Sequence, residues 1–234
     1  MNMKEQEFDA LLKTIDDIRE EDPLKAIFVI DENLKQFLSK EMNNTLNALR
    51  DDITYQIKKN NLITKTNLNT LDLISSLKNK KMDYIFMLNY NELKKRNNLQ
   101  ENASEFQYFF NNQSFEDAYF QTLIYDLLVL KNVDFDFKIK EKIINPKKLG
   151  SFLKNKDLKK MQDEIFNIYE KDVAKTHIAR QVFSAYLFLN WIEILFNETK
   201  NDYNQIINVI NVLLGDKDSN TLNKEELELY KIFK

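Results

Sequence analysis

Apolar residues recur along most of the chain at spacings of three and four residues, which is the pattern of an amphipathic helix. Asp22-Pro23 and Asn145-Pro146 each predict a helix start, because a capping side chain precedes a proline at the first helical position. After Pro23 the apolar spacing continues to about residue 60, which is long for one helix, so we expect a break near residues 39–44. The polar, threonine-rich residues 60–69 predict a linker.

Two segments, residues 115–131 and 173–198, are apolar around most of the helical circumference. Helices of this kind lie in the middle of a protein, because no face of them favours water. The sequence therefore predicts an all-α fold, an irregular bundle of seven to nine helices with these two segments at its centre. We expect residues 1–234 to form a single helical domain, in which residues 1–60 are a candidate for a partly independent N-terminal helical hairpin.

Residues 133–139 form the only run in which apolar and polar residues alternate, as they do in a strand. A lone strand needs a partner, and the sequence shows no obvious one. Hairpin turns usually contain glycine or Asn-Gly, but the chain has two glycines and no Asn-Gly. These features exclude a β-sandwich or a β-barrel.

The composition removes several classes of catalytic and cofactor site. The 234 residues include two glycines, no cysteine and a single histidine, His177. Dinucleotide- and phosphate-binding loops need clustered glycines, zinc–cysteine sites and thiol catalysis need cysteine, and a two-histidine metal site needs a second histidine. We therefore expect a protein that is not an enzyme and has no cofactor, apart from the calcium candidate described below.

No segment approaches the run of about 18 apolar residues that crosses a membrane. The longest apolar stretch, residues 182–196, is interrupted by Ser184, Asn190 and Glu193. The first residues also lack the apolar core of a signal peptide. The sequence therefore predicts a cytoplasmic protein without a membrane partner.

Opposite charges are segregated along the chain, although 34 basic and 37 acidic residues give a net charge of only −3. Residues 56–100 and 138–160 are basic, and the segments around them are acidic. The second basic segment contains nine lysines, which are candidates for binding phosphates or an acidic protein: Lys138, Lys140, Lys142, Lys147, Lys148, Lys154, Lys156, Lys159 and Lys160. Lysine favours contact with backbone charge over base readout. The alternative is that this segment pairs with the acidic segments or is a solvated face.

Asp216, Asp218, Asn220 and Glu226 lie between two predicted helices. Their order resembles the calcium loop of the EF-hand family, in which alternating oxygen ligands are followed by a closing glutamate. The resemblance implies calcium binding at these four residues, although the turn glycine of that family is missing. The alternative is a polar connection in which Gly215 ends one helix and Asn220 or Thr221 caps the next.

Asp117 and Gln121 lie one turn apart on a predicted helix. They are similar to the Asp-x-x-x-Gln pair of chemotaxis-type helical phosphatases, a likeness that implies an amide positioning a water and an acid contacting a partner. The alternative is that Asp117 stabilises the helix N-terminus through the helix dipole.

Asp126, Asn190 and Glu193 interrupt apolar helices, and a buried charge needs a partner. We expect Arg180 or a lysine to be that partner, with a polar pocket inside the bundle as one alternative and a solvated helix edge as the other. For His177 we expect a structural hydrogen bond.

The predicted function is that of a non-enzymatic interaction protein, such as a regulator, an inhibitor or an assembly factor. It would bind another protein through its segregated charged surfaces and aromatic surfaces. One alternative is a nucleic-acid-binding module that uses residues 138–160, with residues 56–100 as a second basic segment. Another is an enzyme with an acid–base site in a pocket that contains His177 or Glu193.

Overall fold

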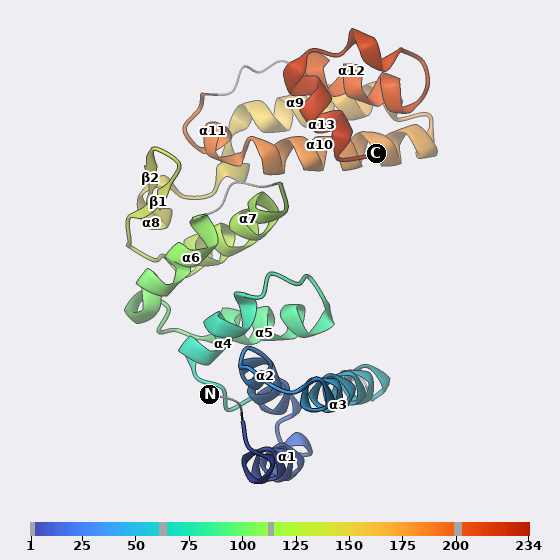
Figure 1. Ribbon diagram of the computed structural model, residues 1–234. Coiled ribbons are helices and arrows are strands. Elements are labelled where there is room, and N and C mark those ends of the chain that lie inside the picture. Colours follow the sequence, from blue (N-terminus) through green and yellow to red (C-terminus); the bar gives the residue numbers. More distant parts are fainter. Residues whose placement is uncertain (1–2, 61–64, 112–114, 199–202) are drawn as a thin grey trace. The chain divides into compact units, whose positions relative to one another are not determined.

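The computed structural model describes residues 3–60, 65–111, 115–198 and 203–234, and helices dominate all four ranges (Figure 1). The all-α prediction is confirmed. The helices, labelled α1 to α13, outnumber the seven to nine predicted, mostly because three are too short to show a periodic pattern: α6 (Gln107–Phe110), α8 (Pro146–Leu149) and α11 (Trp191–Leu195). In the described ranges no helix has the length and apolar character needed to cross a membrane.

The chain divides into two compact units, residues 1–108 and residues 109–234. The single domain expected from the sequence stays a prediction. In the first unit α2 packs against both α1 and α3, and α4 packs against α5 and the 3₁₀-helix η1. The elements of this unit are α1 (Glu5–Arg19), α2 (Pro23–Leu34), α3 (Lys40–Lys59), α4 (Thr70–Leu77), α5 (Tyr84–Lys95) and η1 (Gln100–Phe106).

Local capping determines where the first helices begin. The Asp22 carboxylate accepts a hydrogen bond from the backbone N–H of Lys25 and caps α2, with Pro23 at the first position as predicted. The Ser39 hydroxyl oxygen accepts from the N–H of Met42 and starts α3. A break is therefore present, at residues 35–39, whereas residues 40–44 of the predicted break belong to α3. The described part of residues 1–60 holds three helices, and its partial independence stays a prediction.

Asp22 also holds the end of the predicted linker, of which residues 61–64 lie outside the described ranges. Its second carboxylate oxygen accepts hydrogen bonds from the Thr66 hydroxyl at 3.0 Å and from the Asn67 N–H at 2.7 Å. From the other side, the Arg96 guanidinium donates to the carbonyls of Thr66 and Leu68. Residues 66–68 are thus fixed between α2 and the end of α5.

In the second unit α10 packs against α7, α9, α12 and α13. Figure 1 shows the last three of these gathered on one side of α10. The predicted segment 173–198 is not one helix, because Asn190 leaves helical geometry between α10 and α11. The remaining elements are α7 (Phe115–Leu130), β1 (Phe137–Ile139), β2 (Lys142–Ile144), η2 (Phe152–Lys154), α9 (Lys156–Tyr169), α10 (Val173–Leu189), α12 (Tyr203–Leu213), η3 (Ser219–Thr221) and α13 (Lys224–Lys231).

The predicted strand does have a partner. Phe137–Ile139 pairs antiparallel with Lys142–Ile144, with Ile139 opposite Lys142, so residues 140–141 make a two-residue turn. Lys140 has a φ of 53°, the left-handed conformation that glycine usually supplies in such turns. The hairpin could not be predicted from the sequence because the second strand is too short to show alternation and the turn has no glycine.

Trp191 lies at the centre of an aromatic cluster in the second unit, with 1% of its surface exposed. Its ring centroid lies 5.2 Å from that of Tyr125, 6.1 Å from that of Phe152 and 6.4 Å from that of Phe110. The indole N–H donates to Gln121 Oε1 at 3.4 Å. Residues from α7, α6, η2 and α11 therefore meet at one side chain.

Candidate functional site

One face of α10 lines a groove of about 550 Å³ in the second unit, here called the α10 groove. Tyr119 of α7 and the two residues after α13, Ile232 and Phe233, line the groove together with the α10 residues. The α10 residues are His177, Arg180, Gln181, Ser184, Ala185 and Phe188. The groove is thus built from segments more than 100 residues apart.

The spacing of the α10 residues explains why this face is open. His177, Arg180 and Ser184 follow one another at helical intervals and are exposed, whereas Val182 and Phe183 on other faces are buried. The sequence predicted that α10 would be buried around most of its circumference. This prediction is wrong for the face that carries His177, Arg180 and Ser184, because these polar side chains are exposed.

Arg180 is the most distinctive group in the groove. Its guanidinium lies over the ring of Phe166, 5.7 Å from the centroid, and within the described ranges it forms no hydrogen bond or ion pair. The other three arginines are engaged: Arg19 pairs with Asp16, Arg50 pairs with Asp31, and Arg96 donates to backbone carbonyls. A planar guanidinium with open donors is suited to a carboxylate or a phosphate.

His177 lies one turn before Arg180 on the same face and is exposed. Its expected structural hydrogen bond is not found among the described residues. At the other end of the α10 residues, the ring of Tyr119 packs edge-on against Phe188, with centroids 4.6 Å apart. The groove therefore has a cationic end and an aromatic end, and the described lining contains no aspartate or glutamate.

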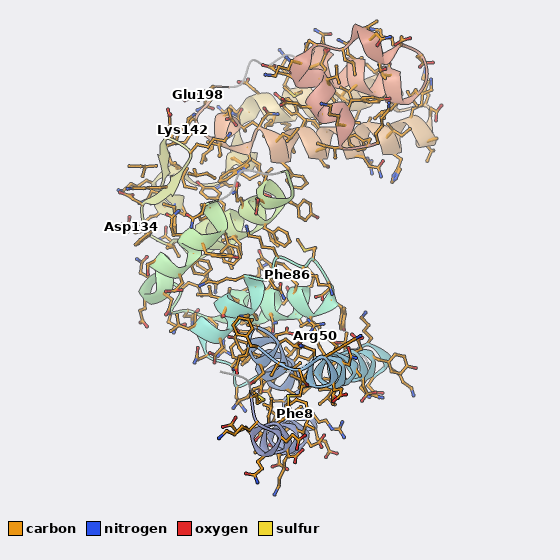
Figure 2. The ribbon with its side chains drawn as sticks, viewed as in Figure 1. Phe8, Arg50, Phe86, Asp134, Lys142 and Glu198 are labelled. Atoms are coloured by element: carbon orange, nitrogen blue, oxygen red, sulfur yellow. The ribbon has the colours of Figure 1, made fainter. Side chains whose placement is uncertain are left out.

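Four of the nine candidate lysines are paired with acidic residues. Lys140 pairs with Glu193 at 3.4 Å, Lys147 with Asp134 at 3.1 Å and Lys148 with Asp136 at 3.4 Å. Lys142 pairs with Glu198, and Figure 2 labels both side chains beside the sheet. The basic segment is therefore partly neutralised by acidic residues that the linear sequence places outside it.

The other five lysines are exposed. Lys138 lies on β1, and no ion pair with a described residue engages Lys154, Lys156, Lys159 or Lys160. These last four belong to η2 and the first turns of α9, where Asp157, Asp163 and Glu164 dilute their charge. Their role in binding a partner or a nucleic acid stays a prediction.

The hairpin base holds a polar cluster around Asn145. The Asn145 side-chain amide donates to Asp134 at 3.0 Å and to Asp136 at 2.6 Å. These hydrogen bonds hold the pKa of both carboxyl groups below the ordinary value, and Lys147 and Lys148 add to the effect. Lys147 and Lys148, two of the nine candidate lysines, are therefore part of this structural cluster.

The lowered pKa values of Asp134 and Asp136 predict that the folded protein loses stability at low pH. An acid whose pKa is depressed in the folded state contributes stability above its unfolded pKa, and this stability disappears as pH falls through the folded pKa. Urea unfolding followed between about pH 6 and 2 should therefore show a steeper loss of stability in the wild type than in a variant carrying Asp134→Asn and Asp136→Asn. A variant carrying Asp163→Asn and Glu164→Gln should follow the wild type. Equal slopes in the wild type and the first variant would contradict the assignment.

The calcium candidates are engaged in local bonds. Asp216 pairs with Lys175 at 3.7 Å, and Asp218 accepts from the N–H of Asn220 and caps η3. Glu226 is buried, and its two oxygens accept from the Asn223 N–H at 2.7 Å and from the Asn208 amide at 2.8 Å. No cluster of three or more His, Cys, Asp or Glu side chains suited to a metal occurs within the described ranges.

The alternative of a polar connection between two helices is met in part. Gly215 has a φ of 79° after α12, and Asn223, rather than Asn220 or Thr221, caps α13. Calcium binding stays a prediction.

The phosphatase-like pair is not presented to a partner. Asp117 and Gln121 are both buried, and Gln121 accepts the indole N–H of Trp191. Gln121 therefore supports the core around Trp191. Its similarity to the phosphatase glutamine does not extend to positioning a water at the surface.

The three polar residues of the apolar helices lie in separate places. Burial raises the pKa of Asp126, whose carboxylate accepts a hydrogen bond from the Ser151 hydroxyl. Asn190 donates to the carbonyl of Tyr186, and Glu193 pairs with Lys140. We expected Arg180 or a lysine to pair with these residues. Arg180 bonds to none of them, whereas a lysine, Lys140, does pair with Glu193.

Comparison with protein-family models, curated proteins and solved structures finds no match to this chain. Its function is therefore inferred from the geometry of its own residues. The polar stripe of α10 was visible in the sequence as His177, Arg180 and Ser184 at helical spacing. The contributions of Tyr119 and Phe233 to the same groove had no signal, because they depend on how distant helices pack.

Proposed function

We propose that the protein is a non-enzymatic interaction protein whose α10 groove binds an acidic segment of a partner protein. The observation that carries the proposal is Arg180, a guanidinium without an acidic partner in the described ranges, inside a groove that also has an aromatic end. Whether the protein acts as a regulator, an inhibitor or an assembly factor depends on which partner it binds. The proposal keeps the cytoplasmic location expected from the sequence.

The cationic end favours a carboxylate. A guanidinium binds a carboxylate through two parallel hydrogen bonds, which add direction as well as charge attraction. The ring of Phe166 beneath Arg180 limits the orientations of its side chain, which lowers the entropic cost of binding. Since the described lining holds no acidic residue, nothing in it competes with an incoming carboxylate.

The aromatic end favours an apolar anchor. Tyr119 and Phe188 pack against each other at this end, and Phe233 also lines the groove. Aromatic rings in a concave setting are where interface anchors contribute most of their energy. Arg180 and Phe188 are eight residues apart on one helix, a span of roughly 12 Å. A partner segment would therefore carry its acidic and apolar residues about four positions apart if extended, or about two turns apart if helical.

The lysine-rich segment supports a protein partner over a nucleic acid at residues 138–160. Four of its nine lysines are paired within the fold, and the four on η2 and α9 share their surface with acidic residues. Nucleic-acid affinity scales with the number of phosphates that unpaired cations neutralise. A mixed surface of this kind suits the rim of a protein interface.

The test uses a phage-displayed library of random peptides panned against the full chain. We expect enrichment of peptides that combine Asp or Glu with an aromatic or large aliphatic residue. Arg180→Gln should weaken binding of the enriched peptide, measured by fluorescence anisotropy, by about tenfold or more, because charge-assisted hydrogen bonds are lost. Arg180→Lys should recover only part of the affinity, since lysine cannot bond in two parallel directions.

Arg19→Gln is the matched control, because this arginine is paired with Asp16 and belongs to the other unit. It should leave peptide affinity unchanged. Enrichment of peptides without acidic residues, or equal affinity of the Arg180→Gln variant and the wild type, would refute the proposal.

A further inference from the structure

Three exposed tyrosines and three exposed lysines of the first unit form what we call the tyrosine–lysine surface: Tyr55, Tyr84, Tyr108, Lys58, Lys59 and Lys81. The exposed fractions are 59% for Tyr55, 37% for Tyr84 and 43% for Tyr108. A lysine ammonium group lies over each ring, and the exposed fractions are those measured with these lysines in place. The rings of Tyr55 and Tyr84 therefore keep exposed surface on which a further group can stack.

Cation–π contacts join the parts of this surface. Lys58 Nζ lies 5.8 Å from the ring centroid of Tyr84, which links the end of α3 to the start of α5. Lys59 Nζ lies 6.0 Å from the centroid of Tyr55, one turn back on α3. The turn between α4 and α5 brings Lys78 to 5.6 Å and Lys80 to 5.4 Å from the ring of Tyr108.

The turn and its tyrosine are held in place. The Tyr108 hydroxyl donates to the carbonyl of Lys78 at 3.2 Å, and Lys78 pairs with Glu105 at 2.8 Å. Asp83 caps α5 through the N–H of Phe86 and lies 3.9 Å from Arg50. Glu105 and Asp83 are thus occupied by structural contacts, whereas Asp51 and Asp52, one turn before Tyr55 on α3, are exposed acidic residues beside this surface.

Three lysines on this surface remain available to an anionic ligand. Lys58, Lys59 and Lys81 are exposed, and no ion pair with a described residue engages them. All three belong to residues 56–100, the first of the two basic segments. Exposed rings interleaved with unpaired lysines are the features with which proteins bind single-stranded nucleic acid, by stacking bases and contacting phosphates.

We infer that the tyrosine–lysine surface binds single-stranded nucleic acid with little sequence preference. A duplex keeps its bases stacked on one another, so it cannot use the tyrosine rings. An acidic peptide would use the lysines but would leave the rings without flat partners. The absence of an arginine among the six defining residues favours backbone contact and stacking over base readout. The inference is independent of the α10 groove, because it rests on residues of the other unit.

The test measures fluorescence anisotropy of labelled oligouridine, oligothymidine and a duplex of the same length with the full chain, over a series of salt concentrations. We expect both single strands to bind more tightly than the duplex. The logarithm of affinity should fall with the logarithm of salt with a slope of about −2, since each of three lysines would neutralise one phosphate and contribute roughly −0.7. A difference between the two single strands would show whether the sugar hydroxyl contributes.

Two sets of variants separate stacking from charge. Tyr84→Ala should lower single-strand affinity by about tenfold, whereas Tyr84→Phe, which keeps the ring, should retain it. Joint substitution of Lys58, Lys59 and Lys81 by glutamine should bring the salt slope close to zero, and Lys94→Gln, an exposed lysine of α5 with no described ring contact, should leave it unchanged.

Several results would overturn the inference. They are the absence of binding at low salt, equal binding of duplex and single strand, or equal losses from Tyr84→Phe and Tyr84→Ala. Loss of binding on joint substitution of Lys154, Lys156, Lys159 and Lys160 by glutamine would place the nucleic-acid site on the second unit instead. Arg180→Gln should not change nucleic-acid affinity, so the failure of one proposal leaves the other distinguishable.

Discussion

Replacing Trp191 with alanine is expected to lower the free energy of unfolding of the second unit by about 4 kcal/mol, as for other large aromatic side chains removed from a core. The indole contacts three rings from three other elements and donates its N–H to Gln121. Truncation would leave a cavity and a buried amide oxygen without its donor, and both effects destabilise the fold. Urea unfolding followed by far-UV circular dichroism measures the change, since the variant lacks the only tryptophan.

Two further variants make this result interpretable. Trp191→Phe keeps a ring in the cluster and should lose less stability than the alanine variant. Phe37→Ala removes an aromatic side chain that is 81% exposed, and surface changes of this kind stay within about 0.5 kcal/mol. If Trp191→Ala and Phe37→Ala unfold at the same urea concentration, the aromatic cluster does not hold the unit together.

The second large effect is expected at Asp22. Asp22→Ala should cost the first unit about 3 kcal/mol, of which roughly 1 is the lost N-cap and the rest the two bonds to residues 66–67. The carboxylate is buried, so the Thr66 hydroxyl and the Asn67 N–H lose an acceptor that water replaces poorly. Urea unfolding of the full chain by circular dichroism provides the measurement.

Asp22→Asn refines this prediction. Its amide oxygen can still accept from the N–H of Lys25, but its NH₂ group would face the N–H of Asn67 in place of an acceptor. We expect a loss smaller than that of Asp22→Ala. Asp17→Ala, at an exposed position of α1, should have almost no effect. An Asp22→Ala variant as stable as Asp17→Ala would show that the attachment of residues 66–68 is not important for stability.

The candidate site could be predicted only in part. The sequence ruled out glycine loops and two-histidine metal sites, but it led us to expect a structural hydrogen bond for His177 and a buried acidic partner for Arg180 rather than an open groove. It could not show that Arg180 alone among the arginines has neither a carboxylate nor a carbonyl partner in the described structure, because the partners of Arg50 and Arg96 lie 19 to 30 positions away. The lysine segment was found by counting charge, but its pairing with Glu193 and Glu198, more than 50 residues later, depends on the fold.

The helical class and the helix starts at Pro23 and Pro146 could be predicted from the sequence, and so could an interruption close to the start of α3. These features depend on side chains within one or two turns of each other, so their physical causes lie within a short stretch of residues. The strand at residues 142–144 and the end of α10 at Leu189 involve residues close together in the chain, but their local sequence pattern carried no signal for them. The face of α10 that stays open depends on Tyr119 and Phe233, which reach the groove from distant segments, and such packing is settled by burial across the whole unit rather than by local propensity.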